Sequence, residues 1–407
     1  MNKKTIVVVG TLANDPYAGM AWMIMQITAG LHRLGHDVYY FEITPTWPYD
    51  PIRQCRVGDS DYAIPYLKKL VAHFGLQDRW AYRQSFSDGS WLGLSKNRAE
   101  DLLANADVVF NITGISRFAR ENLKTGRLVY YGTDPVWHEV NYANGHEKTK
   151  RIVDEHDDVI TYGENIGSST CPIPPLPNLR AHTRQPILLD EWACGPPSRQ
   201  HFTTVGNWSQ EGRDLSFNGE TYLWSKHHEF LKFVELPKRI QIPVELATNL
   251  SPPRVLSPDT EEVIGAVEAF GIEEDAYTRL TRNQWKLVDG PSFSTDPFQY
   301  RDYLQSSGGE FTVARDLNVR LKSGWFSERS ACYLAAGRPV ITQDTGFGTV
   351  LPTGEGLFAF ETMEDILEAF ETIQSDYKRQ CTAALDVARE YFAAEKVLTQ
   401  LLEDLGV

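Results

Sequence analysis

The sequence lacks several patterns that would reveal its chemistry at once. Its five cysteines are odd in number and widely spaced, with no CxxC pair, so we expect neither a disulfide framework nor a zinc site. No GxGxxG follows the first apolar run, which disfavours nicotinamide binding. No apolar stretch reaches the roughly 20 residues that a membrane-spanning helix needs. We therefore expect a cytoplasmic protein without an integral membrane segment, a metal or a bound cofactor.

Positive charge is also scarce. Forty Lys and Arg residues face 54 Asp and Glu residues, which gives a net charge of −14. A nucleic-acid or anionic-membrane partner requires a basic face, and this balance argues against one. Any anionic ligand must be held by a local pocket that works against the overall field.

Apolar strands and helical segments alternate along the chain of 407 residues, which is too long for one ordinary core. The first strand, 6–9, ends at Gly10, a helix follows at 20–34, and the next strand is 37–43. This pattern predicts an α/β fold with parallel sheets. Further strands are predicted at 107–112, 127–131, 158–163, 202–205, 240–247, 285–288, 311–314 and 339–342. Further helices are predicted at 98–106, 220–233, 260–271, 298–306, 363–392 and 395–405.

The proline-rich stretch 171–199 is typical of an extended connection between domains. We place the first domain at 1–198, with 158–163 as its last strand, and the second at 199–385. A C-terminal helical segment, 386–407, follows. The aromatic segment 47–93 either shapes a pocket or packs within the first domain.

Residues 315–360 have the features of a binding site. Ser327 suits the N-cap of a helix that ends near Ala336, and Gln343–Gly348 forms a glycine-punctuated loop after the strand 339–342. Free N–H groups at the helix N-terminus favour an anion, and Arg320 and Lys322 add positive charge just before it. In doubly wound sheets the ligand lies beyond the carboxyl ends of the strands. A nucleotide diphosphate carrying a polar group fits this description.

The segment Ala335–Val340, AAGRPV, resembles the AxGxPV segment of GT-B glycosyltransferases. The resemblance implies an α/β fold of two Rossmann-like, doubly wound parallel-sheet domains that face each other across a cleft. It also implies that 386–407 can cross back to the first domain. Many such enzymes carry two glutamates eight positions apart, where this chain has Gly324 and Cys332, so the ribose and sugar contacts must differ and Glu328 is a candidate.

The first loop of the second domain, Gly206-Asn207-Trp208, also resembles a GT-B donor loop, with Arg213 one residue past the usual lysine position. The adjacent His227 and His228 point about 100° apart on a helix and do not form a zinc pair. The predicted donor-binding residues are Arg213, Arg320, Lys322, Ser323, Gly324, Ser327, Glu328, Gln343, Asp344, Thr345, Gly346 and Phe347.

A second polar cluster follows the strand 127–131. Asp134 and His138 come directly after it, where a general base for an acceptor hydroxyl would be needed. The alternative is a helix cap, because Asp134 precedes Pro135. Asp15, Tyr17 and Gly19, in the loop after the first strand, are expected on the acceptor side of the same cleft.

We therefore expect a glycosyltransferase that moves a sugar from a nucleotide diphosphate-sugar, its co-substrate, to a hydroxyl of a small-molecule or glycan acceptor. Two alternatives remain open. A nucleotide-sugar epimerase of the same fold would use the same donor half without an acceptor pocket. A catalytically inactive protein would bind the nucleotide sugar without turning it over.

Overall fold

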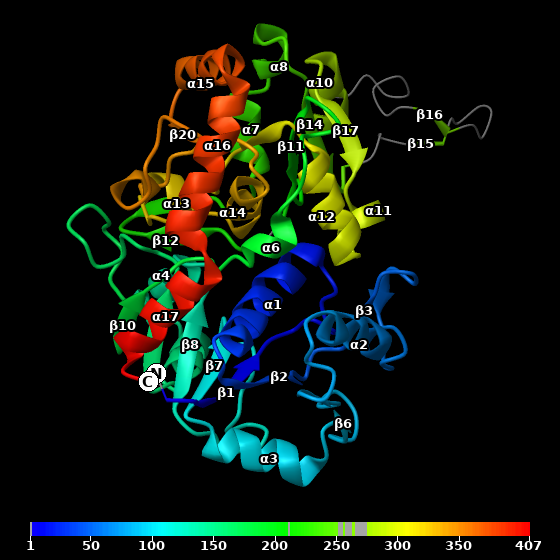
Figure 1. Ribbon diagram of the computed structural model, residues 1–407, viewed down its shortest axis with the longest axis vertical. Helices are drawn as coiled ribbons and strands as arrows, with labels where there is room; N and C mark the ends of the chain where they lie inside the picture. Colours follow the sequence, from blue (N-terminus) through cyan, green and yellow to red (C-terminus); the bar gives the residue numbers. More distant parts are fainter. Residues whose placement is uncertain (1, 211, 251–254, 257–262, 265–274) are drawn as a thin grey trace.

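The computed structural model describes residues 2–210, 212–250, 255–256, 263–264 and 275–407. Two sheets, of eight and six strands, form the centres of two halves that lie one above the other in Figure 1. Helices flank each sheet. The chain is thus an α/β protein with two doubly wound sheets, as its alternating strands and helices predict.

The lower half in Figure 1 holds the eight-stranded sheet, in which every pair is parallel except the last, β5 with β6. In spatial order the strands are β10 (Leu179–His182), β9 (Asp158–Thr161), β8 (Leu128–Gly132), β7 (Val108–Ile112), β1 (Thr5–Val9), β2 (Asp37–Ile43), β5 (Trp80–Arg83) and β6 (Trp91–Gly93). Its helices are α1 (Ala18–Arg33), α2 (Ala63–His73), α3 (Lys96–Asn105), α4 (Trp137–Ala143) and α5 (Glu147–Val153). A short hairpin, β3 (Tyr49–Asp50) and β4 (Cys55–Arg56), stands apart from the sheet.

The upper half holds the six-stranded, wholly parallel sheet. Its strands are β17 (Lys286–Asp289), β14 (Val244–Thr248), β11 (Phe202–Val205), β18 (Gly309–Thr312), β19 (Val340–Gln343) and β20 (Leu357–Phe360). Its helices are α7 (His227–Lys232), α8 (Leu236–Arg239), α10 (Ala276–Arg282), α11 (Pro291–Ser294), α12 (Pro297–Ser306), α13 (Asp316–Arg320), α14 (Glu328–Ala335), α15 (Met363–Ser375) and α16 (Tyr377–Val387). The short helix α6 (Leu189–Trp192) precedes this half.

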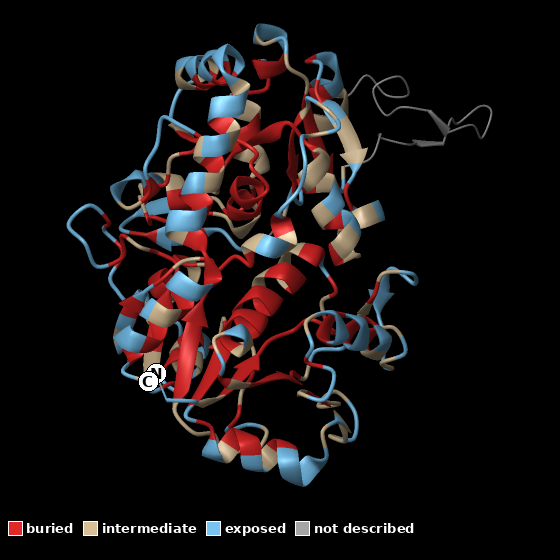
Figure 2. Cartoon of the chain, viewed as in Figure 1, coloured by how far each residue is buried: buried red, intermediate tan, exposed pale blue. Residues whose placement is uncertain are grey.

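Burial follows this arrangement. Figure 2 shows the central strands of both sheets and most of α14 buried, whereas the edge strands β6, β10 and β17 are partly exposed. Every residue of α14 from Ser330 to Ala335 is inaccessible to solvent or nearly so. Predominantly apolar strands such as β1 and β7 are what a sheet covered on both faces requires. In the part of the chain that the structure describes, no helix combines the length and apolarity needed to span a bilayer.

Helix α1 joins the two halves. Its side chain Trp22 is 2% exposed and donates a hydrogen bond from Nε1 to the carbonyl of Pro297, in α12, at 2.8 Å. The Trp22 ring also lies 4.9 Å from that of Trp192. An apolar cluster therefore runs from the first half into the second without a break.

The last helix, α17 (Ala394–Leu405), packs on the first half. Leu398 and Leu402 belong to the apolar cluster around β1, and Gly30 of α1 leaves the space that the Leu398 side chain occupies. Arg127, just before β8, donates to the carbonyl of Leu405 at 2.7 Å. The segment that begins at residue 386 thus returns to the first sheet.

Two sequence-based expectations differ from the structure. Residues 158–163 do not form the last strand of the first sheet, because β10 pairs in parallel with β9 beyond it. This strand lies within the proline-rich stretch, but Pro177 and Pro186 leave a proline-free gap between them, and an edge strand tolerates such neighbours.

The second difference concerns 220–233, where one helix is predicted. The structure has a hairpin of β12 (Leu215–Phe217) and β13 (Glu220–Tyr222), and α7 begins only at His227. Asn218 and Gly219 connect the strands with φ of 51° and 81°, the geometry that an Asn-Gly hairpin turn adopts. The helix predicted at 260–271 falls largely outside the described residues, of which β16 (Val263–Ile264) pairs with β15 (Val255–Leu256).

Candidate functional site

The topology of each sheet marks one place for a ligand. In the second sheet β11 is the first strand, and later strands are added on both of its sides, β14 on one and β18 on the other. Ligands of doubly wound sheets bind outside the carboxyl ends of the strands at such a switch point. Gly206 follows β11 there, and Arg315 comes shortly after β18.

Three cations gather at this switch point, Lys226, Arg315 and Arg329, which we call the basic cluster. Arg329, in the first turn of α14, donates to Oε1 of Glu310 at 2.5 Å and to the carbonyl of Val205 at 2.7 Å. Both partners are buried, so Arg329 is fixed against β18 and the carboxyl end of β11.

Arg315 connects the cluster with the first half. It donates to Oδ1 of Asp134 at 2.5 Å, and its guanidinium lies 3.8 Å from the centre of the Trp224 ring. Exposed Arg213 lies over the same ring, at 5.2 Å. The cluster thus faces the loop after β8 across the boundary between the halves.

Lys226 has no hydrogen-bond or ion-pair partner among the described residues, and its Nζ lies 5.7 Å from the centre of the Trp325 ring. Burial, together with the charges of Arg329 and Arg315, holds the pKa of Lys226 well below its usual range. A half-buried ammonium beside two guanidinium groups is unfavourable unless an anion joins it. This site therefore has an unmet requirement for negative charge.

The space at the switch point is small. The cavity bordered by Gly206, Trp208, Lys226 and Arg329 has a volume of about 10 Å³, roughly one water molecule. A nucleotide can enter only if side chains such as Lys226 turn away or the halves move apart.

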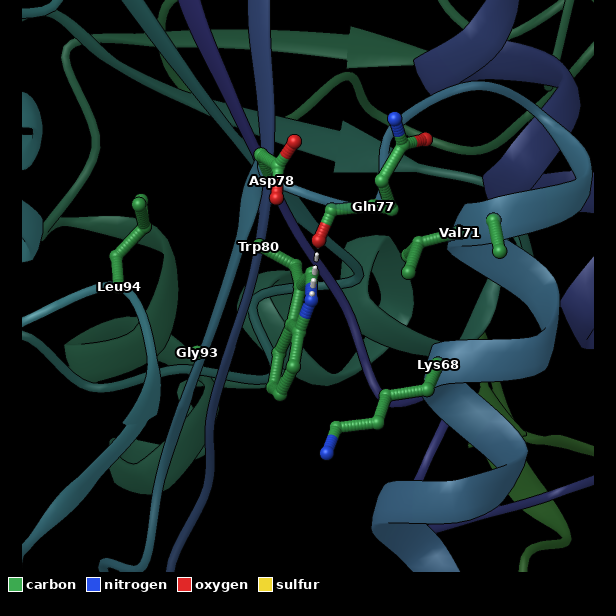
Figure 3. A pocket seen from close by; sticks show the side chains of 8 residues that line it. Lys68, Val71, Gln77, Asp78, Trp80, Gly93 and Leu94 are labelled. Atoms are coloured by element: carbon green, nitrogen blue, oxygen red, sulfur yellow. Dashed lines mark hydrogen bonds between the residues drawn. The ribbon is translucent and has the colours of Figure 1, made fainter.

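A larger pocket of about 480 Å³ lies elsewhere, and Figure 3 shows Trp80 standing in it between Lys68 and Leu94. Trp80 is the first residue of β5. The pocket therefore lies at the amino-terminal edge of the first sheet, opposite to the strand ends that carry the polar cluster after β8.

Arg320 and Lys322, the predicted phosphate contacts, are each paired with two carboxylates. Arg320 bonds Glu220 and lies 3.3 Å from Oδ2 of Asp316. Lys322 lies 2.8 Å from Asp344 and 2.6 Å from Glu361. Because carboxylates already neutralise their charges, Arg320 and Lys322 attract a diphosphate less strongly than the basic cluster does.

The turn Ser323-Gly324 and the loop after β19 are hydrogen-bonded to Asn165 of the first half. Asn165 donates from Nδ2 to the carbonyls of Gly346 at 2.9 Å and Lys322 at 3.2 Å. Its backbone N–H donates to the carbonyl of Ser323 at 3.1 Å. Gly324 and Gly346 both have positive φ, and a Cβ on either would overlap Asn165. These residues form a junction between the halves.

The remaining residues of the β19 loop make internal contacts. Gln343 is buried and donates to Glu229 at 2.7 Å. Thr345 donates to the carbonyl of Trp325 at 2.6 Å, and the Phe347 ring packs 5.2 Å from that of Phe326. The loop thus supports Trp325, which in turn faces Lys226.

Ser327 occupies the N-cap of α14, but its hydroxyl makes no capping hydrogen bond. The next residue, Glu328, points toward the first half, where Gln26 of α1 donates to its Oε1 at 2.6 Å. Burial raises the pKa of Glu328 to about 8. Glu328 therefore contributes to the contact between α14 and α1.

Asp134 does not cap the following helix. The N-cap of α4 is Val136, whose φ is 86°, and its N–H donates to Glu139 at 2.8 Å. Asp134 instead pairs with Arg315, as described above.

His138 bonds the hydroxyl of Tyr130, and burial lowers the pKa of His138 to about 4. The imidazole is neutral at neutral pH.

The buried carboxylate of Glu42, in β2, fixes the loop after β1 by hydrogen bonds to its backbone. Its carboxylate accepts from the N–H groups of Ala13 at 2.9 Å and Asn14 at 2.7 Å, and burial raises its pKa to about 8. Asp15 accepts from Arg56 at 2.5 Å. Tyr17 precedes α1 and is exposed, whereas Gly19 lies in the first turn of α1 near Tyr300.

The sequence contains weak signals for the three cations that we did not predict. Lys226 follows the Asn-Gly hairpin but falls within the helix predicted at 220–233. Arg329 lies next to Glu328 at the helix N-terminus, and Arg315 is the first residue of the segment 315–360. Recognising Asn218-Gly219 as a turn would have moved Lys226 out of the helix and into the loop. No group of three or more His, Cys, Asp or Glu residues in the described ranges could hold a metal ion.

No protein-family model and no curated protein matches the sequence, but solved structures match along its whole length. An alpha-glucosyltransferase in complex with UDP and a 13-mer DNA containing a central A:G mismatch aligns over 100% of both chains, with 11% identity and a TM-score of 0.57. Anabaena HepE in complex with UDP and glucose aligns over 99% of both chains, with 12% identity and a TM-score of 0.54. The protein has the GT-B fold.

Sucrose-phosphate synthase of Thermosynechococcus elongatus, at 13% identity, a TM-score of 0.51 and 98% of both chains, gives the same result. The GT-B fold that the resemblance of Ala335–Val340 implies is thereby confirmed. A GT-B fold consists of two such halves across a cleft, and the basic cluster lies where the second half faces the first.

Proposed function

We propose that this GT-B protein transfers a sugar from a nucleotide diphosphate-sugar to an acceptor hydroxyl. The observation that carries the proposal is Lys226, a half-buried cation without an anionic partner among the described residues, placed beside Arg315 and Arg329 at the switch point of the second sheet. A diphosphate supplies the missing negative charge through charge-assisted hydrogen bonds. The UDP bound by two of the similar structures is consistent with such a ligand.

Diphosphate binding also has a consequence for Asp134. Arg315 is the partner of Asp134 in this structure, at 2.5 Å. A diphosphate held by the basic cluster would compete for Arg315 and release the Asp134 carboxylate toward the cleft. Asp134, with His138 as the second candidate, could then accept the proton of the acceptor hydroxyl, a role worth about 10²–10⁴-fold in rate.

Calorimetry with UDP, GDP and ADP tests the donor site. A charged hydrogen bond contributes about 1.5–3 kcal/mol, so Lys226→Met should weaken diphosphate binding by roughly 10- to 100-fold. Lys238→Met, at an exposed position of α8, is the matched control and should bind as the wild type does. If Arg320→Ala and Lys322→Ala lose affinity and Lys226→Met does not, the diphosphate lies on the turn before α14 instead.

Turnover separates the proposal from its alternatives. The protein is incubated with each nucleotide sugar that it binds, with and without candidate acceptors. Transfer gives a glycosylated acceptor and free nucleotide, an epimerase changes the sugar without using an acceptor, and an inactive binding protein leaves the donor intact. Only the first outcome supports the proposed function.

A further inference from the structure

The large hydrophobic side chains that are exposed in the described part of the chain come from neighbouring segments of the first half. Among the described residues, three large hydrophobic side chains are exposed: Tyr17 at 43%, Trp47 at 52% and Ile52 at 81%. Tyr17 lies at the end of the loop after β1, and the other two lie in or beside the β3–β4 hairpin. Exposed apolar groups that gather in this way mark an interaction site more often than isolated ones do.

This surface is held in a fixed shape. The rings of Tyr17 and Tyr49 stack at 5.9 Å with their planes 24° apart. The N–H of Tyr49 donates to the carbonyl of Asn14 at 2.9 Å. Arg56, opposite Tyr49 in the hairpin, donates to the carbonyl of Trp47 at 2.6 Å and to Asp15 at 2.5 Å. The hairpin and the loop thus form one unit.

The unit borders the second half of the molecule. The loop that carries Tyr17 leaves β1 at the switch point of the first sheet, between β2 and β7. Two residues later, a Cβ on Gly19 would lie 3.8 Å from the hydroxyl of Tyr300 in α12. In Figure 1, β3 projects beside the N-terminal end of α1, below α11 and α12.

We propose that Tyr17, Trp47 and Tyr49, the aromatic platform, bind a sugar ring of the acceptor, so that the acceptor is a saccharide. The flat faces of tyrosine and tryptophan match the C–H face of a pyranose, and aromatic side chains give large contact areas with few rotatable bonds. This inference rests on the proposed transfer of a sugar, for which the first half must supply an acceptor site.

The polar neighbours favour a saccharide over a membrane. Asp15 and Arg56 lie at the rim of the platform as an ion pair at 2.5 Å, and together they can accept from and donate to sugar hydroxyls. Arg53 is paired with Asp50 and Asp59, so its charge is not free for a lipid headgroup. The net charge of −14 also opposes an anionic bilayer.

An array of immobilised oligosaccharides, probed with labelled full-length protein in the presence of UDP, tests the platform. The wild type should be retained by a subset of the saccharides. Tyr17→Ala and Trp47→Ala should each bind that subset about 3- to 10-fold more weakly, as expected for the loss of one stacking contact. Tyr17→Phe and Trp47→Phe keep an aromatic face and should retain most of the binding. UDP affinity, measured by calorimetry, should be the same in all of these variants.

Three results would overturn the inference. The wild type could bind no saccharide although UDP binds normally, or the alanine variants could bind saccharides as the wild type does. Alternatively, the protein could bind phosphatidylcholine vesicles and lose that binding in Ile52→Ser, which would identify a membrane contact. Failure of UDP binding itself would count against the proposed function and is read out separately.

Discussion

Lys226 is a side chain that destabilises the ligand-free folded protein and favours the binding of an anion. Its ammonium is half-buried, lies near two guanidinium groups and has no anionic partner among the described residues. The folded state therefore disfavours the charged form, whereas the unfolded chain does not. A residue of this kind stabilises the folded protein only when an anionic ligand is bound.

This reasoning predicts the effect of Lys226→Met on the protein without ligand. Because the folded pKa of Lys226 lies below its unfolded value, the charge is a penalty at neutral pH that disappears only as pH rises toward 10. The variant should thus unfold at the same or a higher temperature than the wild type at pH 7, while a given concentration of UDP raises its melting temperature less. A clear loss of stability would show that Lys226 has a structural role.

His138 gives a pH-dependent prediction. Its folded pKa is about 4, below the ordinary value of about 6.5, so between these values the unfolded chain binds a proton that the folded chain does not. Stability should therefore fall as pH decreases from 6.5 to 4, by up to about 3 kcal/mol. His138→Gln should lose less over this interval in urea unfolding experiments. Equal losses would mean that His138 does not titrate in this way.

The same pKa separates the two candidate bases. If His138 accepts the proton from the acceptor, kcat/KM should decline only near pH 4. Asp134→Asn keeps the shape of the side chain but cannot take a proton, and it should lower kcat by 10²-fold or more if Asp134 is the base. Near-normal turnover in this variant, with the folded state intact, would leave His138 as the candidate.

At the scale of elements, the loop after β19 contains two glycines with different roles. Gly346 has a φ of 86°, and a Cβ there would lie 2.6 Å from Nδ2 of Asn165, whereas Gly348 has only one neighbour, at 3.9 Å. Gly346→Ala should therefore lower the free energy of unfolding by about 1–3 kcal/mol, from backbone strain and overlap. Gly348→Ala, two residues further along the same loop, should be nearly neutral. Similar melting temperatures for both variants would contradict this assignment.

The elements also show what the sequence could and could not predict. Strands such as 37–43 and 202–205 were predicted with the observed bounds, because both runs are rich in β-branched and aromatic residues, which favour strands. The helix predicted at 220–233 failed where a local Asn-Gly turn outweighed helical periodicity. Residues such as Asp134 and Arg315 are far apart in sequence, and their pairing depends on how the two halves meet, which no local pattern encodes.

The predicted donor residues show the same limit. Clustered positive charge before a glycine turn made Arg320 and Lys322 good candidates. Their carboxylate partners, Glu220 and Glu361, come from distant segments that only the folded chain brings near. Lys226, in contrast, has an ordinary sequence context, and its importance lies in the absence of such a partner among the described residues.

At the scale of the whole molecule, we expect the apolar cluster around Trp22 to couple the two halves into one cooperative unit. Trp22→Ala would leave a cavity between α1 and α12 and should cost about 3–5 kcal/mol. Calorimetry should then resolve two transitions in place of one. Phe370→Ala is the control, because Phe370 is equally buried but lies within the second half alone. It should lower stability without separating the halves, and a single transition in the Trp22 variant would argue against coupling through this cluster.

The position of α17 has a consequence for biosynthesis. The 12-residue helix α17 packs against α1 of the first half, so a nascent chain that has completed the first sheet still exposes the apolar side of α1. That surface is covered only when residues 394–405 leave the ribosome. Domains commonly fold in order as they are synthesised, but here the first half to be made should be the last to become protected from proteases and aggregation.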